Sequence, residues 1–390
     1  MKYWRGYIIT AFLVTVTTAL MAFSKAHGVL VDMIYPYVTR LIQTSMAGWV
    51  SGAEFCLWQL IVVLLGVLFL ASVVLMLILR WNFVQWLGWV LASASLIFCL
   101  HTGVYGLNTY AGDLCDDIRL NQTKYTTSEL AETATYFRDI ANELSTQVPR
   151  NEDGTPNYPS FKELAEMAAN GFDHLVYDKN YSVFAGSTLP VKELGWADMY
   201  TSMGITGIHM PLTAEAAVNP QIPAVALPFV MCHEMSHRMC ISIERDANMG
   251  AFLACDANDN VIFRYSGYFM AFRFCYNALL SEGTSSAKAA AAAIYDGATK
   301  ELQQDLAFYK QFFASKRDQA ASQLANSAND AYIKISGDES GTKSYSEVTD
   351  LLVSWYIQEI YLPAHKDEEV VFDPLDKEQV ENSEYVGGGA

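Results

Sequence analysis

Three long apolar stretches near the N-terminus constrain the fold of this 390-residue chain more than any other feature. They cover about residues 7–23, 56–79 and 83–107, and none of them contains Asp, Glu, Lys or Arg. A helix needs about 20 mainly apolar residues to cross a bilayer. We therefore predict three transmembrane helices within a membrane domain at residues 1–110. The first stretch could also be a signal peptide, but the two that follow make membrane residence independent of cleavage, and we expect an uncleaved anchor.

Basic residues flanking these stretches indicate an orientation. Lys2 and Arg5 precede the first stretch and Arg80 lies in the short second connection, whereas Lys25 and Arg40 fall in the loop between the first two stretches. Because basic residues favour the cytoplasmic side, we predict that the N-terminus and the Arg80 turn face inward. Everything after about residue 108 would then lie outside the cytoplasmic membrane.

Residues 28–50 form an amphipathic segment. Apolar residues recur at helical spacing opposite Asp32, Arg40 and Gln43. The apolar set is Leu30, Ile34, Val38, Leu41 and Ile42. Two interpretations stay open: a helix lying on the membrane surface or against the outer domain, and an ordinary amphipathic helix packed on its own protein.

The rest of the chain is acidic. Of the 25 basic residues only five fall within residues 1–107, and of the 42 acidic residues only two do. The remainder of the chain therefore has 20 basic and 40 acidic residues, a net charge of −20. This charge argues against a nucleic-acid partner. We predict an outer domain at residues 111–362 and an acidic, disordered tail at residues 363–390. The seven cysteines have no CxxC spacing, and we expect buried free thiols.

The segment His233–His237 reads HExxH. Residues four apart on a helix share a face, so both imidazoles can reach one metal ion. Glu234 would lie beside them, close enough to polarise a water molecule and act as general base. An apolar run with Pro228 in its first turn precedes the motif, and Cys240 marks a bend after it. The pattern predicts a catalytic Zn²⁺ site with one open position.

A third protein ligand is still needed, and two residues compete for that role. Glu244 and Asp246 both follow the bend, on a second predicted helix, and we favour Glu244. Glu244, Ala247 and Asn248 form E-x-x-A-N, which resembles the E-x-x-A-D motif of the glutamate zincins (gluzincins). That resemblance implies that Glu244 binds zinc and that Asn248 orients a metal-bound histidine through its amide oxygen.

Motifs spread over most of the chain resemble a family of uncharacterised bacterial membrane proteins, classed as a domain of unknown function. The matching segments are Val31–Pro36, Gly207–Asn219, His233–Asn248, Phe263–Tyr268, Asp330–Lys334 and Ser344–Tyr345. The chain departs from the family pattern at Cys240, Asp246 and Ala217, where glycine, glutamate and asparagine are usual. The resemblance implies a mainly α (α+β) protein. It would have N-terminal transmembrane helices and a zincin-like metallopeptidase domain with a small sheet, and no substrate is implied.

Further residues within the matched segments are candidates for the chemistry. By analogy with zincins, residues 207–210 would form the strand that pairs with extended substrate. Hydrolysis develops an oxyanion that a His or Tyr donor assists, so His209, Tyr265 and Tyr268 are candidate donors. We therefore expect a zinc metallopeptidase, a hydrolase of peptides or proteins, in the bacterial cytoplasmic membrane with its catalytic domain outside. The alternative is a non-catalytic membrane protein with a structural or sensory zinc site.

Overall fold

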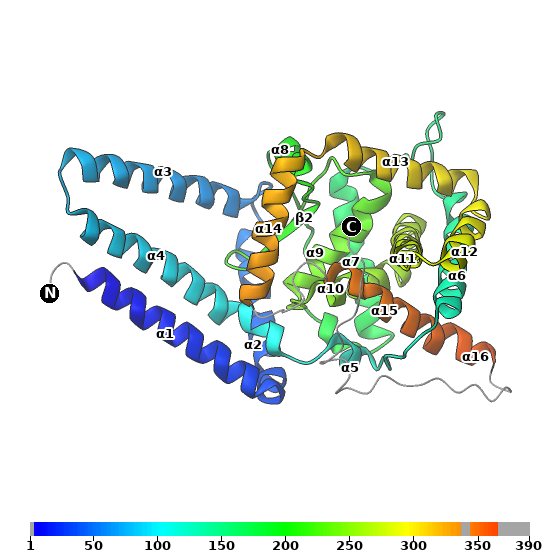
Figure 1. The fold of residues 1–390 in the computed structure, drawn as a ribbon, viewed down its shortest axis with the longest axis horizontal. Coiled ribbons are helices and arrows are strands. Elements are labelled where there is room, and N and C mark those ends of the chain that lie inside the picture. Colours follow the sequence, from blue (N-terminus) through cyan, green and yellow to red (C-terminus); the bar gives the residue numbers. More distant parts are fainter. Residues whose placement is uncertain (1–3, 337–343, 366–390) are drawn as a thin grey trace.

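Three long helices project from one side of a helical domain in the computed structural model, which describes residues 4–336 and 344–365 (Figure 1). They are α1 (Arg5–Ala26), α3 (Leu57–Ile78) and α4 (Phe83–Val104), and each is long and apolar enough to cross a membrane. At 1.5 Å per residue each helix extends about 33 Å, close to the thickness of a bilayer core. The sequence prediction of three long apolar helices is confirmed.

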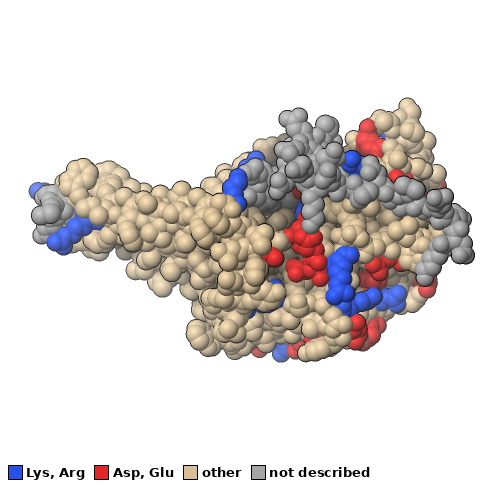
Figure 2. All heavy atoms as spheres, turned by 90° about the horizontal axis from the view of Figure 1, so that it is seen from below, with Lys and Arg blue, Asp and Glu red and all other residues tan. Residues whose placement is uncertain are grey.

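Helices α1 and α4 run side by side, because glycines allow their backbones to approach closely. A Cβ atom added at Gly6 would lie 2.3 Å from the carbonyl carbon of Gly88. Small residues at such contacts are typical of helix packing in membranes. The start of α1 and the turn after α3 lie at the end furthest from the domain (Figure 1). The extension shows little charge along its length, with basic side chains at its free end (Figure 2).

Helix α2 (Gly28–Val50) lies between these helices and the domain, roughly perpendicular to them (Figure 1). Its polar side chains Thr39, Arg40 and Gln43 are buried against the rest of the protein. Its apolar face is exposed, including Leu41 at 69%. Helix α2 therefore packs on its own protein, as the second interpretation expects, and its apolar face is left uncovered by the described residues. This helix packs through its polar face.

The domain is mainly helical. Its helices are α5 (Leu114–Ile118), α6 (Thr127–Ser145), α7 (Phe161–Tyr177), α8 (Ala197–Met203), α9 (Leu227–Arg238), α10 (Glu244–Asp256), α11 (Val261–Ser281), α12 (Ser285–Asp296), α13 (Lys300–Lys316), α14 (Gln319–Ser336), α15 (Ser344–Tyr356) and α16 (Leu362–Ala364). A short 3₁₀ helix at Gly106–Tyr110 joins α4 to the domain, and a π turn at Ile357–Tyr361 follows α15. Capping boxes at Thr126 and Ser160 fix the starts of α6 and α7.

A small sheet completes the α+β fold that the sequence predicts. Its strands are β1 (Lys192–Glu193), β2 (Gly207–Met210) and β3 (Glu215–Val218), in the order β1–β3–β2. Strand β3 pairs parallel with β1 and antiparallel with β2, with Ile208 opposite Ala217. Strand β2 is therefore an edge strand, at the residues expected from the sequence.

Helices α6, α7, α9, α10, α11 and α15 surround one large apolar core. Its fully buried side chains include Phe137, Phe172, Phe252 and Phe269. All seven cysteines are free thiols, and every one except Cys99 is buried, as predicted. The expected tail at 363–390 lies outside the described residues from residue 366 onward.

Candidate metal centre and active-site cleft

Helix α9 carries the HExxH motif and is buried along its whole length. Pro228 lies in its first turn, as expected from a residue that lacks an N–H group. The Nε2 atoms of His233 and His237 lie 3.1 Å apart. The other ring nitrogen of His237, Nδ1, donates to the backbone oxygen of Ile241 at 2.8 Å. This hydrogen bond fixes the ring so that Nε2 presents its lone pair to the cleft.

A tight turn after α9 brings the third group into place. Helix α9 ends at Arg238, and Cys240 adopts a left-handed conformation with φ of 71°. Helix α10 then begins at Glu244, whose Oε2 lies 3.3 Å from His233 Nε2 and 3.4 Å from His237 Nε2. The bend predicted at Cys240 is confirmed.

These three atoms have the spacing of ligands around one metal ion. A tetrahedral Zn²⁺ with bonds of about 2.0–2.1 Å has ligand atoms ~3.3 Å apart, which matches the three observed separations. Two imidazole nitrogens and a carboxylate oxygen are also donors that zinc prefers. The Oε2 atom of Glu244 is buried and has no hydrogen-bond partner among the described residues, as expected of a metal ligand. The donor set and its geometry fit a zinc ion.

The buried groups of the cluster shift one another's pKa values. Burial alone would raise the pKa of Glu244, but His237 and His233 outweigh it and lower this pKa. Burial would lower the pKa of His237, but Glu244 and Glu234 raise it to about 9. Burial lowers the pKa of His233 despite Glu244. The shifts show that Glu244 interacts favourably with the two imidazoles despite its burial.

Asp246, the rival ligand, faces another part of the protein. Its carboxylate accepts hydrogen bonds from the backbone N–H of Leu114 at 3.4 Å and from Arg245 Nε at 3.2 Å. Asn248 lies beside His233, where its amide raises the pKa of that histidine slightly. His233 Nδ1 and Asn248 Nδ2 are buried and have no hydrogen-bond partner among the described residues. Rotating the amide by 180° would offer its oxygen to an Nδ1–H group instead.

Glu234 lies between the histidines and strand β2. It is 4% exposed, and burial raises its pKa to about 8, although His237 opposes this change. A Cβ atom added at Gly207 would lie 2.3 Å from Glu234 Oε1. Glycine at position 207 therefore lets the carboxylate lie directly against the edge strand. A carboxyl group with a raised pKa can both accept and give up a proton near neutral pH.

The cluster opens into a cleft of about 690 Å³, a size suited to a bound ligand. One wall is β2 with residues 204–206, and the floor is His233, Glu234, His237 and Glu244. The end of α4 and the following 3₁₀ helix contribute His101, Tyr105, Gly106 and Thr109. Helix α14 covers the opposite side, and its Tyr332 hydroxyl lies 2.9 Å from His101 Nε2.

Only one of the three predicted oxyanion donors lies in the cleft. His209 does, with its ring centroid 6.5 Å from that of His237 and its Nε2 3.2 Å from Gln43 Oε1. Tyr265 is fully buried and donates to Asp305 at 2.5 Å, and Tyr268 donates to Asp256 at 2.8 Å. These tyrosines stabilise the helical core away from the cleft. The sequence motif could not show this, because it does not tell which way a side chain points.

Sequence reasoning missed Tyr105. Its ring centroid is 5.1 Å from that of His209, and it lines the cleft with Glu234. Burial raises its pKa well above the ordinary value, so its hydroxyl stays protonated and able to donate. Position 105 falls at the end of a predicted apolar span, where a tyrosine reads as an interfacial aromatic residue.

Comparison with known proteins identifies the chain by family. The family model described as Protein of unknown function (DUF3810) matches residues 31–353. The chain belongs to this family. The resemblance noted in the sequence is thus confirmed as far as the family itself. No curated protein and no solved structure matches the DUF3810 chain.

Proposed function

We propose that this protein is a membrane-anchored zinc metallopeptidase. The observation that carries the proposal is the convergence of His233 Nε2, His237 Nε2 and Glu244 Oε2, at 3.1–3.4 Å from one another, in a cleft that also holds Glu234. Among the described residues this is the cluster of His, Cys, Asp and Glu side chains suited to a metal ion. Three protein ligands leave a position open, as in catalytic rather than structural zinc sites.

Each residue then has a defined task. His233, His237 and Glu244 would hold the ion, which when bound supplies Lewis acidity and makes water more acidic. Glu234 accepts a proton from the attacking water and later gives it to the leaving amine. The free edge of β2 pairs with the extended substrate, which places a peptide carbonyl beside Glu234. His209 and Tyr105 line the same cleft and are the candidate donors to the oxyanion.

The metal assignment is tested by elemental analysis of protein purified in detergent. His237→Ala and Glu244→Ala should lose zinc, whereas Asp246→Asn should retain it. Full zinc in Glu244→Ala together with loss in Asp246→Asn would transfer the third-ligand role to Asp246. Full zinc in His237→Ala would exclude this cluster as the site.

Catalysis is tested with a peptide library analysed by mass spectrometry. Glu234→Gln keeps the size of the side chain but removes the base, so it should retain zinc and the fold while turnover falls at least ~10²-fold. An unchanged rate in zinc-loaded Glu234→Gln would exclude this role. Wild-type protein that holds zinc firmly and cleaves no peptide would favour the alternative, a structural or sensory site.

The proposed location is the bacterial cytoplasmic membrane, with three spans and the catalytic domain outside. Arg5 and Arg80 are at the end furthest from the domain, as the positive-inside rule expects of a cytoplasmic end. Protease added to intact protoplasts should digest the chain after about residue 108. Protection of that region would place the domain in the cytoplasm.

A further inference from the structure

Helix α2 presents an apolar face that no other part of the described protein covers. Val29, Met33 and Leu41 are 79%, 67% and 69% exposed, and Trp49 near its end is 84% exposed. Leu30, Ile34, Tyr37 and Val38 extend the same surface. A contiguous apolar helix face of this kind marks a binding surface for a membrane or a protein.

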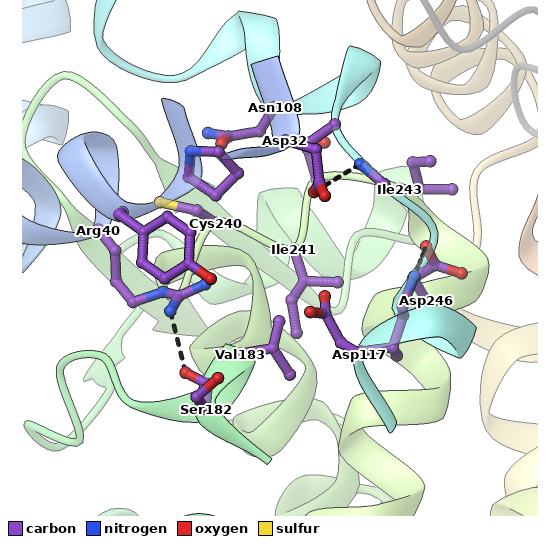
Figure 3. A pocket seen from close by; sticks show the side chains of 16 residues that line it. Asp32, Arg40, Asn108, Asp117, Ser182, Val183, Cys240, Ile241, Ile243 and Asp246 are labelled. Atoms are coloured by element: carbon purple, nitrogen blue, oxygen red, sulfur yellow. Dashed lines mark hydrogen bonds between the residues drawn. The ribbon is translucent and has the colours of Figure 1, made fainter. Parts of the chain in front are cut away.

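The polar face of α2 explains which way the helix must lie. Arg40 Nε donates to the backbone oxygen of Met239 at 3.2 Å. Its Nη1 donates to the backbone oxygen of Ser182 at 3.0 Å (Figure 3). Asp32 accepts from the backbone N–H of Gly112 at 2.9 Å. Gln43 Nε2 donates to the backbone oxygen of Pro211 at 2.9 Å. These hydrogen bonds fix the rotation of α2, so that its apolar face points away from the domain.

The bilayer is the occupant that fits this face. Only His27 separates α2 from α1, and α3 begins at Leu57, soon after α2 ends at Val50. The apolar surface of α2 is therefore continuous with that of the three helices proposed to cross the membrane. Because α2 lies across the ends of these helices, it runs in the plane of the membrane surface (Figure 1).

This placement puts the cleft at the lipid surface. Gln43 of α2 contacts both His209 and Pro211 on or beside β2, so a single helix separates the edge strand from the bilayer. A helix is roughly 10 Å across. The lining of the cleft also includes His101 and Tyr105, which are at the end of α4, one of the helices proposed to cross the membrane. An extended chain covers 10 Å in about three residues.

We infer that the substrates are polypeptides anchored in the same membrane, cut within about the first ten extended residues outside the bilayer. This inference rests on the proposed function and specifies its substrate class. A chain leaving the bilayer beside α2 needs only a few residues to reach the edge of β2. Confinement of enzyme and substrate to one membrane also raises the local substrate concentration, and a soluble peptide does not gain this advantage.

The substrate class is tested by presenting one peptide library in two formats to the full-length enzyme in liposomes. The library is either free in solution or fused to a transmembrane helix through spacers of about 2, 6, 12 and 30 residues. We expect the anchored library to be cleaved at least ~10-fold faster at equal bulk concentration, fastest with the shorter spacers that still reach β2. Equal rates in both formats, or no dependence on spacer length, would overturn the inference and leave the peptidase assignment standing. Cleavage of neither format, matching Glu234→Gln, would refute the peptidase assignment itself.

The position of α2 is tested independently of cleavage. A nitroxide label at Leu41→Cys should be accessible to oxygen and shielded from a water-soluble nickel reagent in liposomes. The matched control is Tyr177→Cys, 78% exposed on α7, which should show the reverse. Wild-type protein gives the labelling background, since every native cysteine except Cys99 is buried. Exposure of the Leu41 label to nickel would overturn the inference. Shielding of this label from both oxygen and nickel would also overturn it, because protein rather than lipid would then cover α2.

Discussion

The close approach of Gly207 to Glu234 allows the proposed catalytic geometry to be perturbed without removing any functional group. In Gly207→Ala the new Cβ atom would lie 2.3 Å from Glu234 Oε1 and 2.7 Å from its Cδ and Cγ, whereas ordinary contacts begin near 3.4 Å. The carboxylate must therefore move by about 1 Å. A displacement of this size at a reacting group costs on the order of 10²-fold in rate.

Stability should change little, because the clash involves the flexible end of a side chain rather than backbone. The metal ligands are not touched, so zinc content and the unfolding temperature should remain close to those of the wild type. The assay is steady-state cleavage of a peptide identified in the library, with kcat and KM separated. Gly52→Ala is the matched control, since an added Cβ there meets nothing within 4 Å.

Two results would refute this reasoning. Wild-type kcat in Gly207→Ala would show that Glu234 does not act from its observed position. Loss of zinc in the same variant would show that β2 supports the cluster rather than the base. Gly52→Ala should keep the wild-type kcat. An equal loss of kcat in both variants would point to a general effect of added methyl groups on the fold.

Substitutions at three further positions test parts of the structure outside the cleft. Gly6→Leu should push α1 away from the backbone of Gly88 on α4 and lower thermal stability in detergent, and an unchanged unfolding temperature would contradict the observed backbone contact. Cys240→Gly should be more stable than Cys240→Ala by about 1 kcal/mol, because only glycine adopts φ of 71° without strain. Denaturant titrations measure this difference, and equal stabilities would show that the turn is not strained. Asp305→Asn should destabilise by about 3–5 kcal/mol, since it leaves the Arg150 guanidinium without its buried ion pair at 2.8 Å. A loss below 1 kcal/mol, measured by the same titration, would show that the pair is not needed.

The parts of the fold that depend on local chemistry could be predicted from sequence. The three apolar stretches become α1, α3 and α4 because helix formation satisfies every backbone group without water. His233, His237 and Glu244 converge because a four-residue spacing and a tight turn leave little freedom. Strand β2 matches its prediction residue for residue.

Elements fixed by tertiary context could not be predicted. Helix α11 is buried on nearly all sides, so its sequence lacks the polar stripe that reveals an amphipathic helix. The Ala-rich stretch at 285–328 is divided into α12, α13 and α14. Gly297 ends α12 before Thr299 caps the start of α13, and an extended Arg317 ends α13. Tyr105 enters the cleft only because the chain turns immediately after α4.

Helix α2 lies between the proposed membrane surface and the candidate metal site, and Arg40 makes a coupling between them testable. Its guanidinium satisfies the carbonyls of Met239 and Ser182, and Met239 directly precedes the strained turn at Cys240. Arg40→Met keeps the length of the side chain but leaves two carbonyls without partners, each costing about 1–3 kcal/mol. The turn that sets the distance from His237 to Glu244 should then loosen, and zinc affinity should fall about 10–100-fold, as for other groups that orient metal ligands. Arg40→Lys retains one donor group and should lose less. Metal competition titrations measure both variants, and wild-type affinity in Arg40→Met would show that the turn holds its geometry without α2.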